Sequence, residues 1–206
     1  MRVVFIFIVL LLLIGIAVPI GIAAKLWMDA GAVVARAERD GELRATPAGA
    51  PLTTVERTIA MYEFRDTWRS RALPCRTLFS LWNEIATEQP SSGLSVSQKL
   101  AATVPADQPR SIRWQVRSLL VACQLEQRFD DRQILRMWLA RANFGRDAIG
   151  IENAAQTIFG KPSRSLSVEE AARLTALLRA PSLRTQPERW AERGRLIEER
   201  VSVRTP

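Results

Sequence analysis

Residues 143–182 read NFGRDAIGIENAAQTIFGKPSRSLSVEEAARLTALLRAPS, and this stretch decides the fold. Its first half carries apolar residues at the i, i+3, i+4 and i+7 spacing of one helix face: Ile151, Ala154, Ala155 and Ile158. The triplet GKP that follows ends this helix. Ser167, with Glu170 three residues later, has the pattern of a capping box and opens a second helix that stops before Pro181.

The same helical periodicity extends along the chain in both directions. Downstream, Pro187 suits the first turn of a final helix that reaches about Val201. Upstream, Asp130 and Gln133 form another capping-box pattern. Three further stripes are expected to be buried: Leu78, Leu81, Trp82 and Ile85; Val116, Leu119, Leu120 and Cys123; and Ile134, Leu135, Trp138 and Leu139. We find no alternating strand pattern over residues 53–206 and predict one all-α domain.

The first two dozen residues differ from the rest of the chain. Val3–Ala24 is an apolar run of 22 residues, and about 20 suffice to span a bilayer as a helix. The apolar region of a cleaved signal peptide is usually only about 7–15 residues long, so an anchor is favoured and cleavage is the alternative. We therefore expect a transmembrane anchor at 3–26, a juxtamembrane helix and linker at 27–52, and the folded domain at 53–206.

The composition limits which partners and which catalytic groups the protein can use. The net charge is +8, and arginine supplies 26 of the 29 basic residues. Beside a bilayer this excess attracts anionic lipid headgroups or a phosphate-bearing substrate; no nucleic-acid-binding motif is present, so nucleic acid is not an expected partner. There is no histidine, which excludes Ser-His and Cys-His nucleophile arrangements. Catalysis must then rest on carboxylates, hydroxyls and arginines.

The two cysteines, Cys75 and Cys123, are too few for a structural zinc site. Both lie among apolar neighbours, which favours buried free thiols. A disulfide is the alternative if the domain faces an oxidising compartment.

The stretch 143–182 resembles the C-terminal half of the membrane-bound peptidoglycan glycosyltransferase domain of bifunctional penicillin-binding proteins and monofunctional transglycosylases. The matching positions keep their spacing without a gap: Phe144, Gly145, Gly150, Glu152, Ala154, Ala155, Phe159, Gly160, Lys161, Leu166, Glu170, Ala171, Ala172, Pro181 and Ser182. The family's Arg-Arg pair in the terminal helix falls on Arg193 and Gly194. The resemblance covers about residues 55 to 201 and implies a lysozyme-like helical fold behind an N-terminal transmembrane helix. No transpeptidase domain follows, so we expect the monofunctional arrangement.

Ser92–Ala101, SGLSVSQKLA, resembles the family's Gly-rich Ser-Thr-x-Thr-Gln-Gln motif. Ser95, Ser97 and Gln98 fall on its two Thr and its first Gln, whereas Lys99 replaces the second Gln. Hydroxyl and amide groups in a cleft suit sugar and phosphate recognition, so the resemblance implies that these three residues bind substrate. A helix N-cap is the alternative interpretation.

In this family two glutamates carry the chemistry, and the first takes the proton from the acceptor sugar hydroxyl. Counting back from the Ser-rich motif places Glu63 at this first glutamate, with Asp66 as its partner on the same helix face. The resemblance therefore implies that Glu63 is the catalytic residue. The other elements of its Glu-Asp-x-x-Phe-x-x-His-x-Gly motif differ: Phe64, Thr67, Ser70 and Ala72 stand at the Asp, Phe, His and Gly positions.

The second glutamate assists at the departing pyrophosphate and lies in an Arg-Lys-x-x-Glu motif. Residues 114–118, WQVRS, fall on this motif, so Ser118 stands where the glutamate belongs. The loss of one positioned catalytic group commonly costs about a hundred- to ten-thousand-fold in rate. Arg113 and Arg117 are expected to offer positive charge to a diphosphate, the alternative being ordinary exposed arginines. Glu126, two turns further, is assigned no role.

The resemblance implies a bacterial inner-membrane enzyme, its domain facing the periplasm or cell exterior, that polymerises lipid-linked disaccharide into nascent glycan. Other cell-wall synthesis proteins are expected partners. No metal held by protein ligands is predicted, and a divalent Mg²⁺ or Mn²⁺ bound with the diphosphate is left open. One alternative is a catalytically degenerate relative that keeps the fold to bind glycan, lipid-linked precursor or a partner. Another is a lytic transglycosylase that works with Glu63 alone, although the usual motifs around this residue are missing.

Overall fold

The structure, a computed structural model, describes residues 2–64, 75, 94–104, 112–145 and 147–202. Within these ranges it contains helices and no strand, which confirms the all-α prediction. The helices are α1 (Arg2–Arg39), α2 (Thr54–Glu63), α4 (Val96–Ala101), α5 (Ile112–Arg128), α6 (Asp131–Leu139), α7 (Ile151–Phe159), α8 (Val168–Arg179) and α9 (Pro187–Ser202), with two 3-10 helices, η1 (Ser163–Ser165) and η2 (Pro181–Thr185). The predicted stripe of Leu78, Leu81, Trp82 and Ile85 lies outside the described residues.

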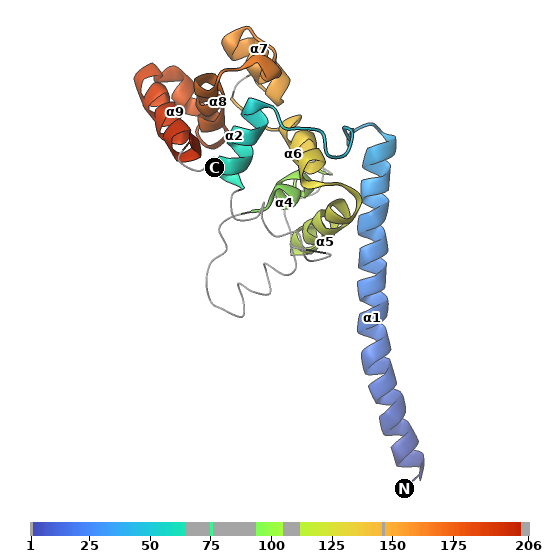
Figure 1. The fold of residues 1–206 in the computed structure, drawn as a ribbon. Helices are drawn as coiled ribbons and strands as arrows, with labels where there is room; N and C mark the ends of the chain where they lie inside the picture. The colour runs from blue at the N-terminus through green and yellow to red at the C-terminus, as the bar shows by residue number, and fades with distance from the viewer. Residues whose placement is uncertain (1, 65–74, 76–93, 105–111, 146, 203–206) are drawn as a thin grey trace.

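Helix α1 is one continuous rod of 38 residues along one side of the domain (Figure 1). The predicted anchor and the predicted juxtamembrane helix are thus a single helix. Its part Ala17–Arg39 is long and apolar enough to cross a membrane. The C-terminal half packs against α5 and buries Ala30 and Val34 completely. Helix α1 is therefore tied to the domain by helix packing as well as by the chain.

The segment predicted as a linker is held against α6. Asp130 accepts a hydrogen bond from the backbone N–H of Gly49 at 2.9 Å. Arg136 donates to the carbonyl of Pro51 at 2.7 Å and forms an ion pair with Glu56 at 2.9 Å. Both side chains of that pair are largely shielded from solvent, which strengthens the attraction between them. These contacts fix where the chain enters α2.

The core of the domain lies between two groups of helices. Helices α2, α8 and α9 pack together at the end of the molecule away from α1, whereas α4 packs against α5 and α6 (Figure 1). Phe64, at the end of α2, meets Trp138 of α6 in an edge-to-face contact with ring centroids 5.3 Å apart. This contact joins the two groups, and Leu100 and Leu135 are fully buried in the same core cluster.

Local signals set the helix ends as predicted. The boxes formed by Asp130 with Gln133 and by Ser167 with Glu170 both have their two reciprocal hydrogen bonds. Gly150 precedes α7 with φ +84°, and a Cβ there would lie 2.7 Å from the carbonyl oxygen of Ala140. Only glycine fits this turn, because it combines a left-handed backbone with close contact to a neighbouring chain segment.

Two expectations were wrong. Val116 is 41% exposed, because the buried face of α5 consists instead of residues from Val121 onward that meet α1 and α4.

Cys75 and Cys123 form a disulfide, with their Cα atoms 4.9 Å apart, in place of the two free thiols. Apolar neighbours indicated burial, and Cys123 is buried, but burial does not distinguish a thiol from a disulfide.

Candidate functional site

Glu63 ends α2 at the point where α2, α4 and α8 converge. Its side chain is only 2% exposed. One carboxylate oxygen, Oε2, accepts a hydrogen bond from Nζ of Lys99 at 3.1 Å, and the other, Oε1, accepts one from Nε of Arg179 at 2.5 Å. The buried carboxylate is thus held between two cations, an arrangement referred to below as the Glu63 clamp.

Lys99 forms the inner side of the Glu63 clamp. It lies in the last turn of α4, and its side chain is 28% exposed. Its ammonium nitrogen lies 4.8 Å from the ring centroid of Phe64 and 5.0 Å from that of Trp138. A cation over aromatic faces is attracted by the ring quadrupoles. These contacts fix the ammonium where it neutralises Glu63.

Arg179 forms the outer side of the Glu63 clamp. It lies in the last turn of α8, its side chain is 59% exposed, and its guanidinium carbon lies 5.6 Å from the ring centroid of Tyr62. The hydrogen bond to Glu63 raises the pKa of Arg179 above its ordinary value, so it stays a cation. Lys99 is more shielded than Arg179. The Glu63 clamp therefore has one shielded side and one exposed side.

The Ser-rich motif lies at the start of α4, beside the clamp. Ser95 caps the helix, and the side-chain oxygen of Gln98 accepts the Ser95 backbone N–H at 2.7 Å. The hydroxyls of Ser95 and Ser97 are 2.8 Å apart, and Ser97 donates to Glu126 at 2.5 Å. Ser95 and Gln98 thus have a local structural role, as the alternative interpretation supposed.

Glu126 was missed by the sequence analysis. It lies on α5 where this helix packs against α4, and it accepts the hydrogen bond of the buried Ser97 hydroxyl. Ser97 and Lys99 of α4 thus contact carboxylates on two different helices, Glu126 on α5 and Glu63 at the end of α2. The signal that could have found it is the helical spacing, because Glu126 continues the predicted stripe of Leu119 and Cys123 at i, i+4 and i+7.

Arg117, one of the two predicted diphosphate arginines, lines a separate cavity of about 840 Å³ between α1 and α5, together with Arg36 and Asp40. Ser118 is half-buried on the same helix. The side chain of Arg113 and the whole of Asp66 lie outside the described residues.

The site residues do not fit a metal ion held by protein ligands. In the described ranges, no three residues among His, Cys, Asp and Glu are grouped to hold one. Glu63 already contacts two cations, and a third positive charge beside them would be repelled.

A model of the family described as Transglycosylase matches residues 53–202. The chain belongs to the transglycosylase family. The match runs from the N-cap of α2 to the last residue of α9, so it includes every helix that contributes to the Glu63 clamp. The resemblance found in the sequence is confirmed.

Relatives of this transglycosylase fall into two groups by name. It is 33% identical to penicillin-binding protein 1C of Escherichia coli over 144 residues, which is 69% of this chain and 19% of that protein. It is 34% identical to penicillin-binding protein 1A of Aquifex aeolicus over 112 residues, 53% of this chain and 15% of that protein. A biosynthetic peptidoglycan transglycosylase of Acinetobacter baumannii is 34% identical over 91 residues, 44% of this chain and 40% of that protein. The chain thus spans less than half the length of each of these relatives.

Proposed function

We propose that this transglycosylase is a membrane-anchored peptidoglycan glycosyltransferase that acts on lipid-linked disaccharide, with Glu63 as its base. The observation that carries the proposal is the Glu63 clamp, a buried carboxylate at the family's first glutamate position with one exposed cation partner. The names of the relatives support the substrate class, since one is a biosynthetic peptidoglycan transglycosylase. The apolar helix α1 supports an anchor in the inner membrane.

In the proposed reaction, Arg179 rotates away from Glu63 and frees Oε1. The freed oxygen accepts the proton of the acceptor sugar hydroxyl while the sugar oxygen attacks the anomeric carbon of the donor. The bond from that carbon to the diphosphate oxygen breaks, and the diphosphate leaves with the electron pair. Lys99 stays on Oε2 and holds the carboxylate in place. Arg179, once released, carries a positive charge suited to the departing diphosphate.

A second candidate function is recognition of the lipid-linked disaccharide without polymerisation. It is favoured by the same clamp, because both Glu63 oxygens accept hydrogen bonds from cations, and by Ser118 at the place of the second glutamate. In this version the two cations stabilise the fold and Glu63 is never a base. The lytic alternative requires one glutamate acting as an acid, and no described contact favours it.

A polymerisation assay with fluorescent lipid-linked disaccharide distinguishes the two candidate functions. The full-length protein is compared with Glu63→Gln and with Arg179→Gln, which keeps a polar side chain but removes the outer cation. Glycan chains from the parent and none from Glu63→Gln are expected for the glycosyltransferase. Absence of chains from both the parent and Arg179→Gln, with substrate binding retained, would leave recognition as the function.

A further inference from the structure

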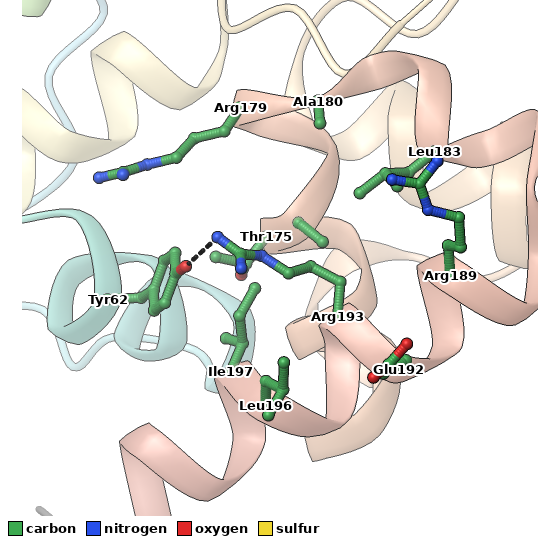
Figure 2. A pocket seen from close by; sticks show the side chains of 11 residues that line it. Tyr62, Thr175, Arg179, Ala180, Leu183, Arg189, Glu192, Arg193, Leu196 and Ile197 are labelled. Carbon is green, nitrogen blue, oxygen red and sulfur yellow. Dashed lines mark hydrogen bonds between the residues drawn. The ribbon is translucent and has the colours of Figure 1, made fainter.

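A pocket of about 370 Å³ lies between α2, α8 and α9, next to the outer side of the Glu63 clamp. Figure 2 shows Tyr62 of α2 facing Arg193 of α9 across it, with Arg189 one turn earlier on α9 and Arg179 at its edge. Small-molecule sites usually begin at about 300 Å³, so this pocket is large enough for a small ligand.

Two of its arginines have no acidic partner. Arg193 donates to the Tyr62 hydroxyl at 3.0 Å, and Arg189 donates to the amide oxygen of Gln186 at 2.5 Å. Over the residues that the structure describes, neither forms an ion pair. Some arginines elsewhere do so, as Arg136 with Glu56 shows. A guanidinium has five N–H donors, so both retain donors for a ligand.

Apart from Tyr62, Thr175 and the arginines, the lining of the pocket is aliphatic and carries one acidic group. Its aliphatic lining comes from α8, η2 and α9: Ala176, Ala180, Leu183, Leu196 and Ile197. Glu192 adds a carboxylate to the lining. A monoanion with a short aliphatic body matches this surface better than a dianion, because Glu192 repels the second charge and the aliphatic groups cannot solvate it.

We propose that this pocket binds a small organic carboxylate, with Arg193 on the carboxylate group, the aliphatic lining around its body, and Arg189 adding positive charge on the side of Leu183 (Figure 2). Guanidinium and carboxylate match in geometry and form paired charge-assisted hydrogen bonds. The Tyr62 hydroxyl holds Arg193 on the α2 side of the pocket (Figure 2). The proposal does not depend on glycosyl transfer, since binding is measured without any reaction.

The test is a titration of the full-length protein in detergent with N-acetylalanine, followed by ligand-observed NMR. Saturable binding is expected for the parent. Arg193→Lys, which keeps the charge but loses the planar fork, should bind several-fold more weakly, and Arg193→Gln and Arg189→Gln about tenfold or more. Arg195→Gln is the matched control, because Arg195 lies on the same helix, is 71% exposed and does not line the pocket.

Two further probes test the chemistry of the ligand. N-acetylalanine amide, which lacks the charge, should not bind, and inorganic phosphate should bind more weakly than the carboxylate. Circular dichroism of each variant, with its thermal midpoint, shows that the fold is kept. The proposal is overturned if the parent does not bind, if the amide binds equally well, if phosphate binds more tightly, or if Arg195→Gln weakens binding as much as Arg193→Gln.

Discussion

The two cations on Glu63 differ in exposure, and this difference decides what each contributes. Lys99 is 28% exposed and packed over two rings, whereas Arg179 is 59% exposed. An ion pair with an exposed partner is screened by water and adds at most about 1 kcal/mol. Removing a shielded partner leaves a buried carboxylate without compensation and costs more. We therefore expect Lys99 to contribute more to stability and Arg179 to be the more mobile of the two residues.

We expect Lys99→Met to lower the free energy of unfolding by about 1–3 kcal/mol, and Arg179→Met by less than about 1 kcal/mol. Methionine keeps most of the side-chain volume, so the comparison isolates the charge. Lys161→Met is the control, since Lys161 pairs with Glu170 at 2.6 Å on the surface and is 49% exposed. Urea denaturation measures all three. An equal loss for Lys99→Met and Arg179→Met would contradict the division between a shielded and an exposed cation.

At the scale of elements, the sequence predicted those helices whose ends are set by residues within the helix or next to it. The helices α6, α7, α8 and α9 were predicted close to their ends, because capping residues, glycines and prolines act within a turn of the helix. The Glu63 clamp was not predicted, because Glu63 and Arg179 are 116 positions apart and meet only through packing of α2 on α8. Glu126 was missed for the same reason: its partner Ser97 comes from another helix.

The turn before α7 offers a test of backbone control. Gly150→Ala should lower the free energy of unfolding by about 2–4 kcal/mol, because a Cβ there meets the Ala140 carbonyl oxygen at 2.7 Å and φ is +84°. Gly160→Ala is the control: its φ is +67°, but nothing lies within 4 Å of a Cβ, so only the conformational cost of about 1–2 kcal/mol applies. Thermal unfolding of both variants gives the comparison. A similar loss for both would show that the contact with Ala140 has no effect.

The stability that the cap of α6 contributes to the fold should depend on pH. Burial raises the pKa of Asp130, but hydrogen bonds from the backbone N–H groups of Gln133, Gly49 and Arg132 outweigh burial, so the pKa lies below the ordinary 3.8. A lowered folded-state pKa stabilises the fold above the unfolded-state pKa, and the contribution is lost as pH falls through the folded-state value.

Asp130→Asn therefore isolates this carboxylate. Asparagine still caps α6, but its amide nitrogen cannot accept the Gly49 N–H. We expect a loss of about 1 kcal/mol at pH 7, modest because the group is partly exposed. The difference from the parent should shrink as pH falls below 3.8. Urea denaturation from pH 7 to pH 3 measures it, and a difference that is constant with pH would argue against a role for the charge.

For the whole molecule, helix packing connects α1, the proposed membrane anchor, to the candidate site. The C-terminal half of α1 packs on α5, α5 packs on α4, and α4 supplies Ser97 and Lys99 (Figure 1). The same α5 carries Cys123, whose disulfide partner Cys75 is 48 positions away. Disulfides persist in oxidising compartments and are rare in a reducing cytoplasm. This bond therefore supports the proposed orientation, with the domain outside the inner membrane.

The orientation can be tested through the cysteines. In a Cys75→Ala, Cys123→Ala background, Ser202→Cys places a single thiol at an exposed position in α9. A membrane-impermeant maleimide should label this thiol in intact cells if the domain faces the periplasm. In the parent, denatured without reductant, Cys75 and Cys123 should resist labelling, and reduction should lower the free energy of unfolding by about 2–4 kcal/mol. Parent thiols that label without reduction, together with an unlabelled Ser202→Cys, would place the domain in the cytoplasm, away from any lipid-linked substrate presented on the outer face.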